Sequence, residues 1–74
     1  MKEIFPHIAV DAGVQFGKPV IAGTRVPVEV IVGHIAAGMD IATVAGEYRI
    51  TREDVLAALK YASKLLAEEA VMAR

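Results

Sequence analysis

All three prolines of the chain lie in its first 27 residues, at positions 6, 19 and 27. Because proline removes a backbone N–H and clashes with the preceding helical turn, this segment cannot form one long helix. It also holds β-branched clusters at residues 8–10, 20–21 and 26, separated by glycines. These features predict a short two-stranded β piece in residues 1–27, which is too small to be stable without helices packed against it.

Residues 28–74 contain no proline, and their pattern predicts three helices. The first helix follows Pro27, carries apolar residues at helical spacing and stops at Gly38. Asp40 is a suitable N-cap for a short second helix. Thr51 and Asp54 have the spacing of a capping box for a third helix, which we expect to run from residue 52 to about residue 73.

A short helix, a connection at residues 48–50 and a capped longer helix have the spacing of a helix-turn-helix. The sequence therefore predicts a mainly α fold. We expect a three-helix core of the helix-turn-helix type, similar to a homeodomain or a winged helix, with the two-stranded piece at its N-terminus. With 74 residues, a single domain spanning residues 1–74 is expected.

The apolar content is high for so small a chain. Hydrophobic residues make up 55% of it, and its mean hydropathy is +0.48. A domain of this size buries only about 60% of the surface of its unfolded chain, so little interior is available. We therefore expect part of the apolar surface to contact a partner, either a second copy, with a dimer favoured, or another protein.

The third helix shows where this excess could lie. Five of its apolar residues form a stripe that we expect to face the core: Val55, Leu59, Ala62, Leu66 and Ala70. A second line is formed by Tyr61, Leu65 and Met72. This line is either ordinary scattered exposure or a surface that packs on another chain, and the overall composition favours the latter.

Catalysis is not expected. The two histidines, His7 and His34, are not spaced as metal ligands, and there are no cysteines. The lone serine, Ser63, lies in the middle of the third helix and not in a nucleophile motif. We expect no enzyme, no metal and no cofactor. The N-terminus lacks the apolar core of a signal peptide, and the longest apolar stretch is too short for a bilayer, so a cytoplasmic protein without a membrane role is expected.

DNA binding is a second possibility. In a helix-turn-helix the start of the second motif helix enters the major groove, which assigns candidate DNA contacts to Arg49, Thr51 and Arg52. The adjacent carboxylates of Glu53 and Asp54 oppose a polyanion, and the net charge of −1 gives no general attraction to DNA. Such binding would depend strongly on salt and would need a dimer.

Three runs of the sequence resemble one family. Residues 16–28 read FGKPVIAGTRVPV, residues 36–40 read AAGMD, and residues 51–62 read TREDVLAALKYA after Tyr48 and Ile50. They resemble the signatures GKPVIxGTRIPV, AAGMS and EYPxLTxEDVxAALxYA of the family catalogued as domain of unknown function 433. The chain differs from that family in having Arg49 where proline is common and in having a less acidic second helix.

The resemblance implies an antitoxin-like protein of the VapB type, with a helix-turn-helix and a PIN-like ribonuclease toxin as its partner. Such toxins hold magnesium with acidic residues, and an antitoxin can block that site with a basic residue. The run at residues 16–28 is expected to be largely structural, and its key members are Gly17, Lys18, Pro19, Gly23, Thr24, Arg25 and Pro27. A direct contact of Arg25 with a partner is the alternative for that residue.

Three hypotheses therefore stay open from the sequence. The first is an antitoxin that neutralises a PIN-like toxin and also represses its own operon. The second is a DNA-binding transcriptional regulator without a toxin. The third is a homo-oligomerisation module without a nucleic-acid role, in which the line of Tyr61, Leu65 and Met72 is buried between copies.

Overall fold

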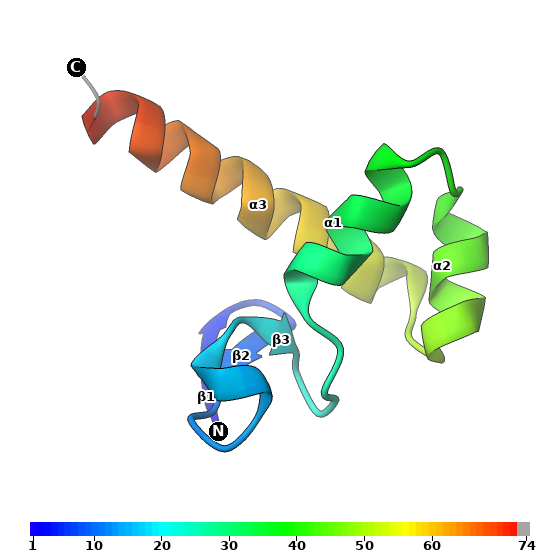
Figure 1. The fold of residues 1–74 in the computed structure, drawn as a ribbon, viewed down its shortest axis with the longest axis horizontal. Coiled ribbons are helices and arrows are strands. Elements are labelled where there is room, and N and C mark those ends of the chain that lie inside the picture. The colour runs from blue at the N-terminus through cyan, green and yellow to red at the C-terminus, as the bar shows by residue number, and fades with distance from the viewer. Residues whose placement is uncertain (73–74) are drawn as a thin grey trace.

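A small antiparallel sheet precedes three helices in the computed structural model, which describes residues 1–72 and the side chains of residues 1–69. In chain order the elements are β1 (Lys2–Phe5), β2 (Ile8–Val10), a short turn of helix η1 (Gln15–Gly17), β3 (Val20–Ile21), α1 (Val28–Ala36), α2 (Ile41–Tyr48) and α3 (Arg52–Met72) (Figure 1). The prediction of a mainly α chain with an N-terminal β piece is confirmed.

The sheet has three strands, not the predicted two, in the order β1-β2-β3. The strand missing from the prediction is β1, whose Lys2 lies opposite Val10 of β2, with an irregularity between Glu3 and Phe5. Residues 2–5 carry no regular apolar alternation in the sequence, and their order comes from pairing with β2. The cluster at residue 26 is not a strand, although Pro27 forms an isolated bridge with Val20.

The helix ends follow the predicted local signals. Gly38 has φ of +103° directly after α1, a conformation that glycine adopts without steric cost. The Asp40 carboxylate accepts a hydrogen bond from the Thr43 amide at 2.7 Å and so caps α2. At the start of α3, the Asp54 amide donates to the Thr51 hydroxyl and the Thr51 amide donates to the Asp54 carboxylate, each at 3.0 Å. This reciprocal pair is the predicted capping box.

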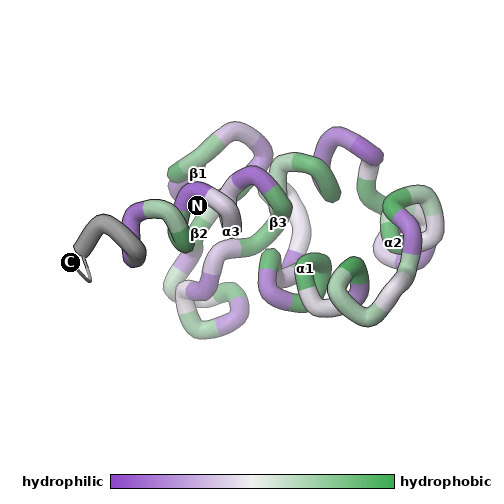
Figure 2. Tube along the Cα trace, turned by 90° about the horizontal axis from the view of Figure 1, so that it is seen from above, coloured by the Kyte–Doolittle hydropathy of each residue, from purple (hydrophilic) through white to green (hydrophobic). Residues whose placement is uncertain are grey.

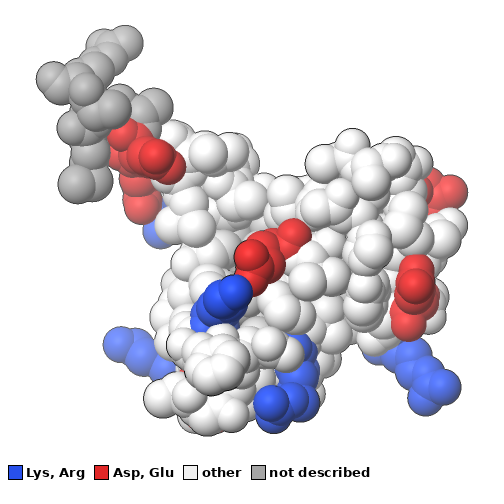
Figure 3. All heavy atoms as spheres, in the orientation of Figure 1, with Lys and Arg blue, Asp and Glu red and all other residues white. Residues whose placement is uncertain are grey.

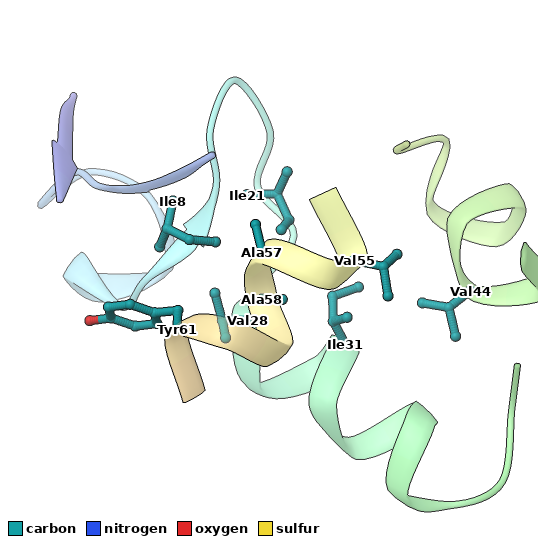
Figure 4. Close-up of a cluster of buried hydrophobic side chains, with 9 residues drawn as sticks. All are labelled: Ile8, Ile21, Val28, Ile31, Val44, Val55, Ala57, Ala58 and Tyr61. Carbon is teal, nitrogen blue, oxygen red and sulfur yellow. The ribbon is translucent and has the colours of Figure 1, made fainter. Parts of the chain in front are cut away.

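The core forms where the first half of α3 meets all the other elements (Figure 4). The sheet contributes Ile8 and Ile21, α1 contributes Val28 and Ile31, and α2 contributes Val44. These side chains surround four residues of α3: Val55, Ala57, Ala58 and Tyr61. Two alanines in this stretch let the neighbouring elements approach the helix axis closely.

The second half of α3 extends beyond the sheet and α1 (Figures 1 and 2). Residues 63–69 are all exposed. The predicted inward stripe therefore holds only in its first part. Val55 is buried and Leu59 and Ala62 are half-buried, but Leu66 is 66% exposed and the side chain of Ala70 lies outside the described part. The buried face of α3 instead includes Ala57, Ala58 and Tyr61, which lie outside the stripe that helical periodicity predicts.

Over the residues that the structure describes, none of the three helices combines the length and the apolarity needed to cross a bilayer.

Two glycine substitutions test how the backbone positions these helices. A Cβ added at Gly46 or at Gly38 meets nothing within 4 Å, so packing does not distinguish the two sites. Gly46 lies inside α2, where alanine should raise the free energy of unfolding by about 0.5–1 kcal/mol. Gly38 has a positive φ, so alanine there should lower the free energy of unfolding by more than about 1 kcal/mol. Equal shifts in urea denaturation would contradict this assignment of the helix ends.

Candidate partner-binding surfaces

The turn at residues 23–26 is stabilised from within. Gly23 has φ of +80°. The Thr24 hydroxyl donates to the Ile21 carbonyl at 2.8 Å and accepts from the Val26 amide at 3.0 Å. The Ile21 amide closes the turn by donating to the Val26 carbonyl at 2.9 Å. These bonds and the positive φ give a physical reason for the glycine and the threonine of the GTRVP segment.

Arg25 is carried at the tip of this turn. Its carbonyl accepts a hydrogen bond from the Gln15 side chain at 3.2 Å, while its side chain is exposed. Within the described part of the chain, its guanidinium makes no salt bridge. The pKa of the Asp11 carboxyl is lowered first by the Gly13 amide, and the charge of Arg25 also lowers it. A fixed backbone thus presents an exposed cation that has a carboxylate nearby but forms no salt bridge among the described residues.

The other members of this run fix the entry to α1. Lys18 forms an ion pair with Glu29 on α1 at 2.8 Å. The Pro19 carbonyl accepts a hydrogen bond from the Val28 amide at 3.0 Å. Pro27 occupies the N-cap position of α1, and Gly17 has φ of +80°. A structural role for Gly17, Lys18, Pro19 and Pro27 stays a prediction, for which these contacts give a physical basis.

An open apolar groove of about 660 Å³ lies between the start of α1 and the second half of α3. Its walls are formed by Lys18, Pro19, Val28, Glu29, Val32, Gly33, Tyr61, Ala62, Leu65, Leu66 and Glu69. In Figure 3 most of the visible face is uncharged, and charges of both signs are scattered over it.

Tyr61 corrects one of the sequence interpretations. The sequence predicts it on the second line of α3, which is available to a partner, but it is only 8% exposed. Its ring packs on Phe5 of β1, with ring centroids 5.5 Å apart, because the strand missing from the prediction covers that side of the helix. Leu65 does remain 43% exposed and lines the groove, together with Leu66. The side chain of Met72 lies outside the described part.

Phe16 is an exposed aromatic residue that the sequence analysis did not single out. It is 97% exposed and has φ of +57°. Its neighbours Gln15 and Gly17 also have positive φ, of +51° and +80°. The only sequence signal for this feature is an aromatic residue placed before a glycine in a turn-rich stretch.

The connection between α2 and α3 carries the predicted DNA contacts. Arg49 ends α2 in the left-handed conformation, with φ of +55°. Arg49, Thr51 and Arg52 are all exposed, so the structure brings these three residues to one end of α3. Glu53 beside them is also exposed. Asp54, in contrast, is half-buried, and its carboxylate accepts hydrogen bonds.

Both histidines link distant parts of the chain. His7 is hydrogen-bonded through Nδ1 to the Asp54 carboxylate at 2.7 Å and so ties the β1–β2 turn to the start of α3. His34 on α1 is hydrogen-bonded through Nε2 to the Tyr48 hydroxyl of α2 at 2.6 Å. Among the described residues, no three histidines or carboxylates gather as a metal site.

The pKa of the Asp54 carboxyl is lowered. Partial burial raises it, but the Thr51 amide, the His7 ring and the Thr51 hydroxyl together outweigh the burial. One carboxylate thus serves both the helix cap and the contact with the β1–β2 turn.

Comparison with known proteins places the chain in a family. It belongs to the family described as protein of unknown function DUF433, whose sequence profile matches residues 8–62. No curated protein sequence matches it. The chain is similar to the crystal structure of Rv2018 from Mycobacterium tuberculosis, with a TM-score of 0.65 and 31% identity. The match covers 70% of this chain and 24% of that one, so this chain corresponds to about a quarter of Rv2018.

The Asp54 contacts predict a dependence of stability on pH. A carboxyl whose pKa in the folded state lies below its ordinary value of 3.8 stabilises the fold above that value, and the contribution is lost as pH falls through the folded-state pKa. The difference in unfolding free energy between wild type and Asp54→Asn should therefore be constant above about pH 5 and should shrink as the pH falls to about 2. Urea titrations across this range measure it, and a difference that does not change with pH would contradict the role assigned to the carboxylate.

Proposed function

We propose that this chain is an antitoxin-like protein that binds and neutralises a PIN-like ribonuclease toxin through Arg25. The observation that carries the proposal is an exposed arginine on an internally hydrogen-bonded turn, without a salt bridge among the described residues. An arginine held in this way can enter a cluster of carboxylates that would otherwise hold magnesium. Because the turn is already ordered, little conformational entropy is lost when it binds.

DNA binding by the α2–α3 region is a second candidate, supported by a specific observation. Three residues, 49–51, separate the end of α2 from the start of α3, and exposed arginines stand at positions 49 and 52. This arrangement supports a helix-turn-helix in which the start of α3 enters the major groove. The engagement of Asp54 by His7 and Thr51 directs one of the opposing carboxylates into the protein. An antitoxin that also binds its operator would use this end of the molecule.

A pair of matched substitutions separates the two activities. Arg25→Gln and Arg52→Gln each remove one exposed cation and keep a side chain of similar length. Arg25→Gln should weaken binding to the ribonuclease encoded beside this chain by about thirtyfold or more, because a charge at a buried contact is lost. It should also abolish rescue of growth on co-expression, while leaving DNA binding unchanged.

Arg52→Gln should have the opposite profile. Ribonuclease binding should be retained, and affinity for the chain's own promoter should fall about fivefold or more with a shallower salt dependence. Isothermal titration with the ribonuclease and fluorescence anisotropy with promoter DNA measure the two effects. Full neutralisation by Arg25→Gln would refute the toxin proposal, and an absence of DNA binding at low salt would refute the second.

A further inference from the structure

Phe16 is carried on a hydrogen-bonded turn, and its side chain is not packed into the core of the described fold. The Gly17 amide donates to the Val14 carbonyl at 3.0 Å, and the Lys18 amide donates to the Gln15 carbonyl at 3.1 Å, so hydrogen bonds close the turn that carries it. Left-handed backbone is uncommon for a bulky residue and persists only where the surrounding structure holds it. The fold thus maintains an unfavourable conformation that leaves an aromatic ring 97% exposed.

The α1–α3 groove is a suitable receptor for such a ring. Its volume of about 660 Å³ lies within the usual range of ligand pockets. Its floor is apolar, with Val28 and Tyr61 buried in it and Leu65 and Leu66 exposed along its α3 wall. Gly33 leaves space on the α1 wall, because a Cβ there would meet nothing within 4 Å. A chain cannot fill its own groove with Phe16, since that side chain is almost fully exposed.

We propose that the chain forms a two-fold dimer in which Phe16 of each copy inserts into the α1–α3 groove of the other. The ring and the groove adjoin along the chain, because Lys18 and Pro19, directly after the η1 turn, form one wall of the groove. With a two-fold axis between the ring and the groove, each copy inserts its Phe16 into the other, so both insertions form together, as in any interface between identical surfaces. The dimer does not rest on the toxin or DNA activity proposed above.

The surface area sets the expected strength of the dimer. A phenylalanine buries roughly 150–250 Å², and the groove walls that it covers, Leu65 and Leu66 included, lose a comparable area. Two reciprocal insertions therefore remove about 600–1,000 Å² of surface, which is the size of a weak and concentration-dependent interface.

The charges at the groove also fit an apolar occupant. Lys18 and Glu29 form an ion pair with each other within one copy, so only Glu69 adds a net charge to the lining. The remaining walls are apolar, which suits an uncharged aromatic ring as the occupant.

Phe16→Asn removes the inserted ring. Asparagine tolerates the left-handed backbone well, so the η1 turn should be retained. Because two-fold symmetry deletes two contacts from each dimer, the dissociation constant measured by sedimentation equilibrium should rise about a hundredfold or more.

Gly33→Gln fills the groove and has a matched control in Gly46→Gln. Both glycines are exposed within helices, and a Cβ at either one meets nothing within 4 Å. Both substitutions should raise helix propensity equally. Only Gly33→Gln should weaken the dimer, by about a hundredfold or more, whereas Gly46→Gln should leave the dissociation constant unchanged.

Mixing the two variants tests the reciprocal insertion directly. Phe16→Asn retains the groove without the ring, and Gly33→Gln retains the ring without the groove. A heterodimer of the two restores one of the two contacts, so the mixture should associate about tenfold more tightly than either variant alone. A general loss of folding in either variant could not produce this gain.

Several results would overturn the dimer. These are a wild-type chain that stays monomeric at high concentration, variants that associate as tightly as wild type, a mixture without heterodimer, or a control that weakens association as much as Gly33→Gln. A monomer that binds the ribonuclease or DNA through Phe16 would also overturn it, and would assign the ring to that partner.

Discussion

The fold depends on one short surface, the first half of α3. Val55, Ala58 and Tyr61 belong to one buried cluster with side chains of the sheet, α1 and α2, so these elements share the core on α3. The Asp54 carboxylate joins two of these contacts, because it caps α3 and also binds His7 in the β1–β2 turn. A chain of this size has few buried residues, and sharing one helix face among three elements makes the small core sufficient.

Because the core occupies only the first half of α3, apolar surface remains outside it. Among the residues whose side chains the structure describes, those of α3 from 63 to 69 are all exposed, and they include Leu65 and Leu66 beside the groove. The stretch from residue 16 to residue 28 has two tasks. It orders the entry to α1, and it carries two exposed side chains, Phe16 on the η1 turn and Arg25 at the tip of a separate turn. The family signature thus coincides with a scaffold that presents two exposed side chains, each of them suited to a different kind of contact.

The sequence predicted well what depends on local interactions. The helix ends at Gly38, Asp40 and Thr51 are set by backbone conformation and by side-chain caps within three residues, and each is confirmed. What it could not predict depends on distant pairing. The third strand, β1, is ordered by β2 and α3, and because it covers Tyr61, that side chain is core and not spare surface. Helical periodicity gives the apolar faces of α3 but not which of them the sheet will cover.

The central claim joins two parts: the first half of α3 holds the core within one copy of the chain, and we propose that a second copy covers the second half. Hydrogen exchange of the full chain at low and at high protein concentration tests it most directly. Amides of residues 55–61 should exchange slowly and equally at both concentrations, because global unfolding controls them. Amides of residues 62–69 should exchange faster when dilute and become protected as concentration rises. Protection of residues 62–69 that does not change with concentration would contradict the account.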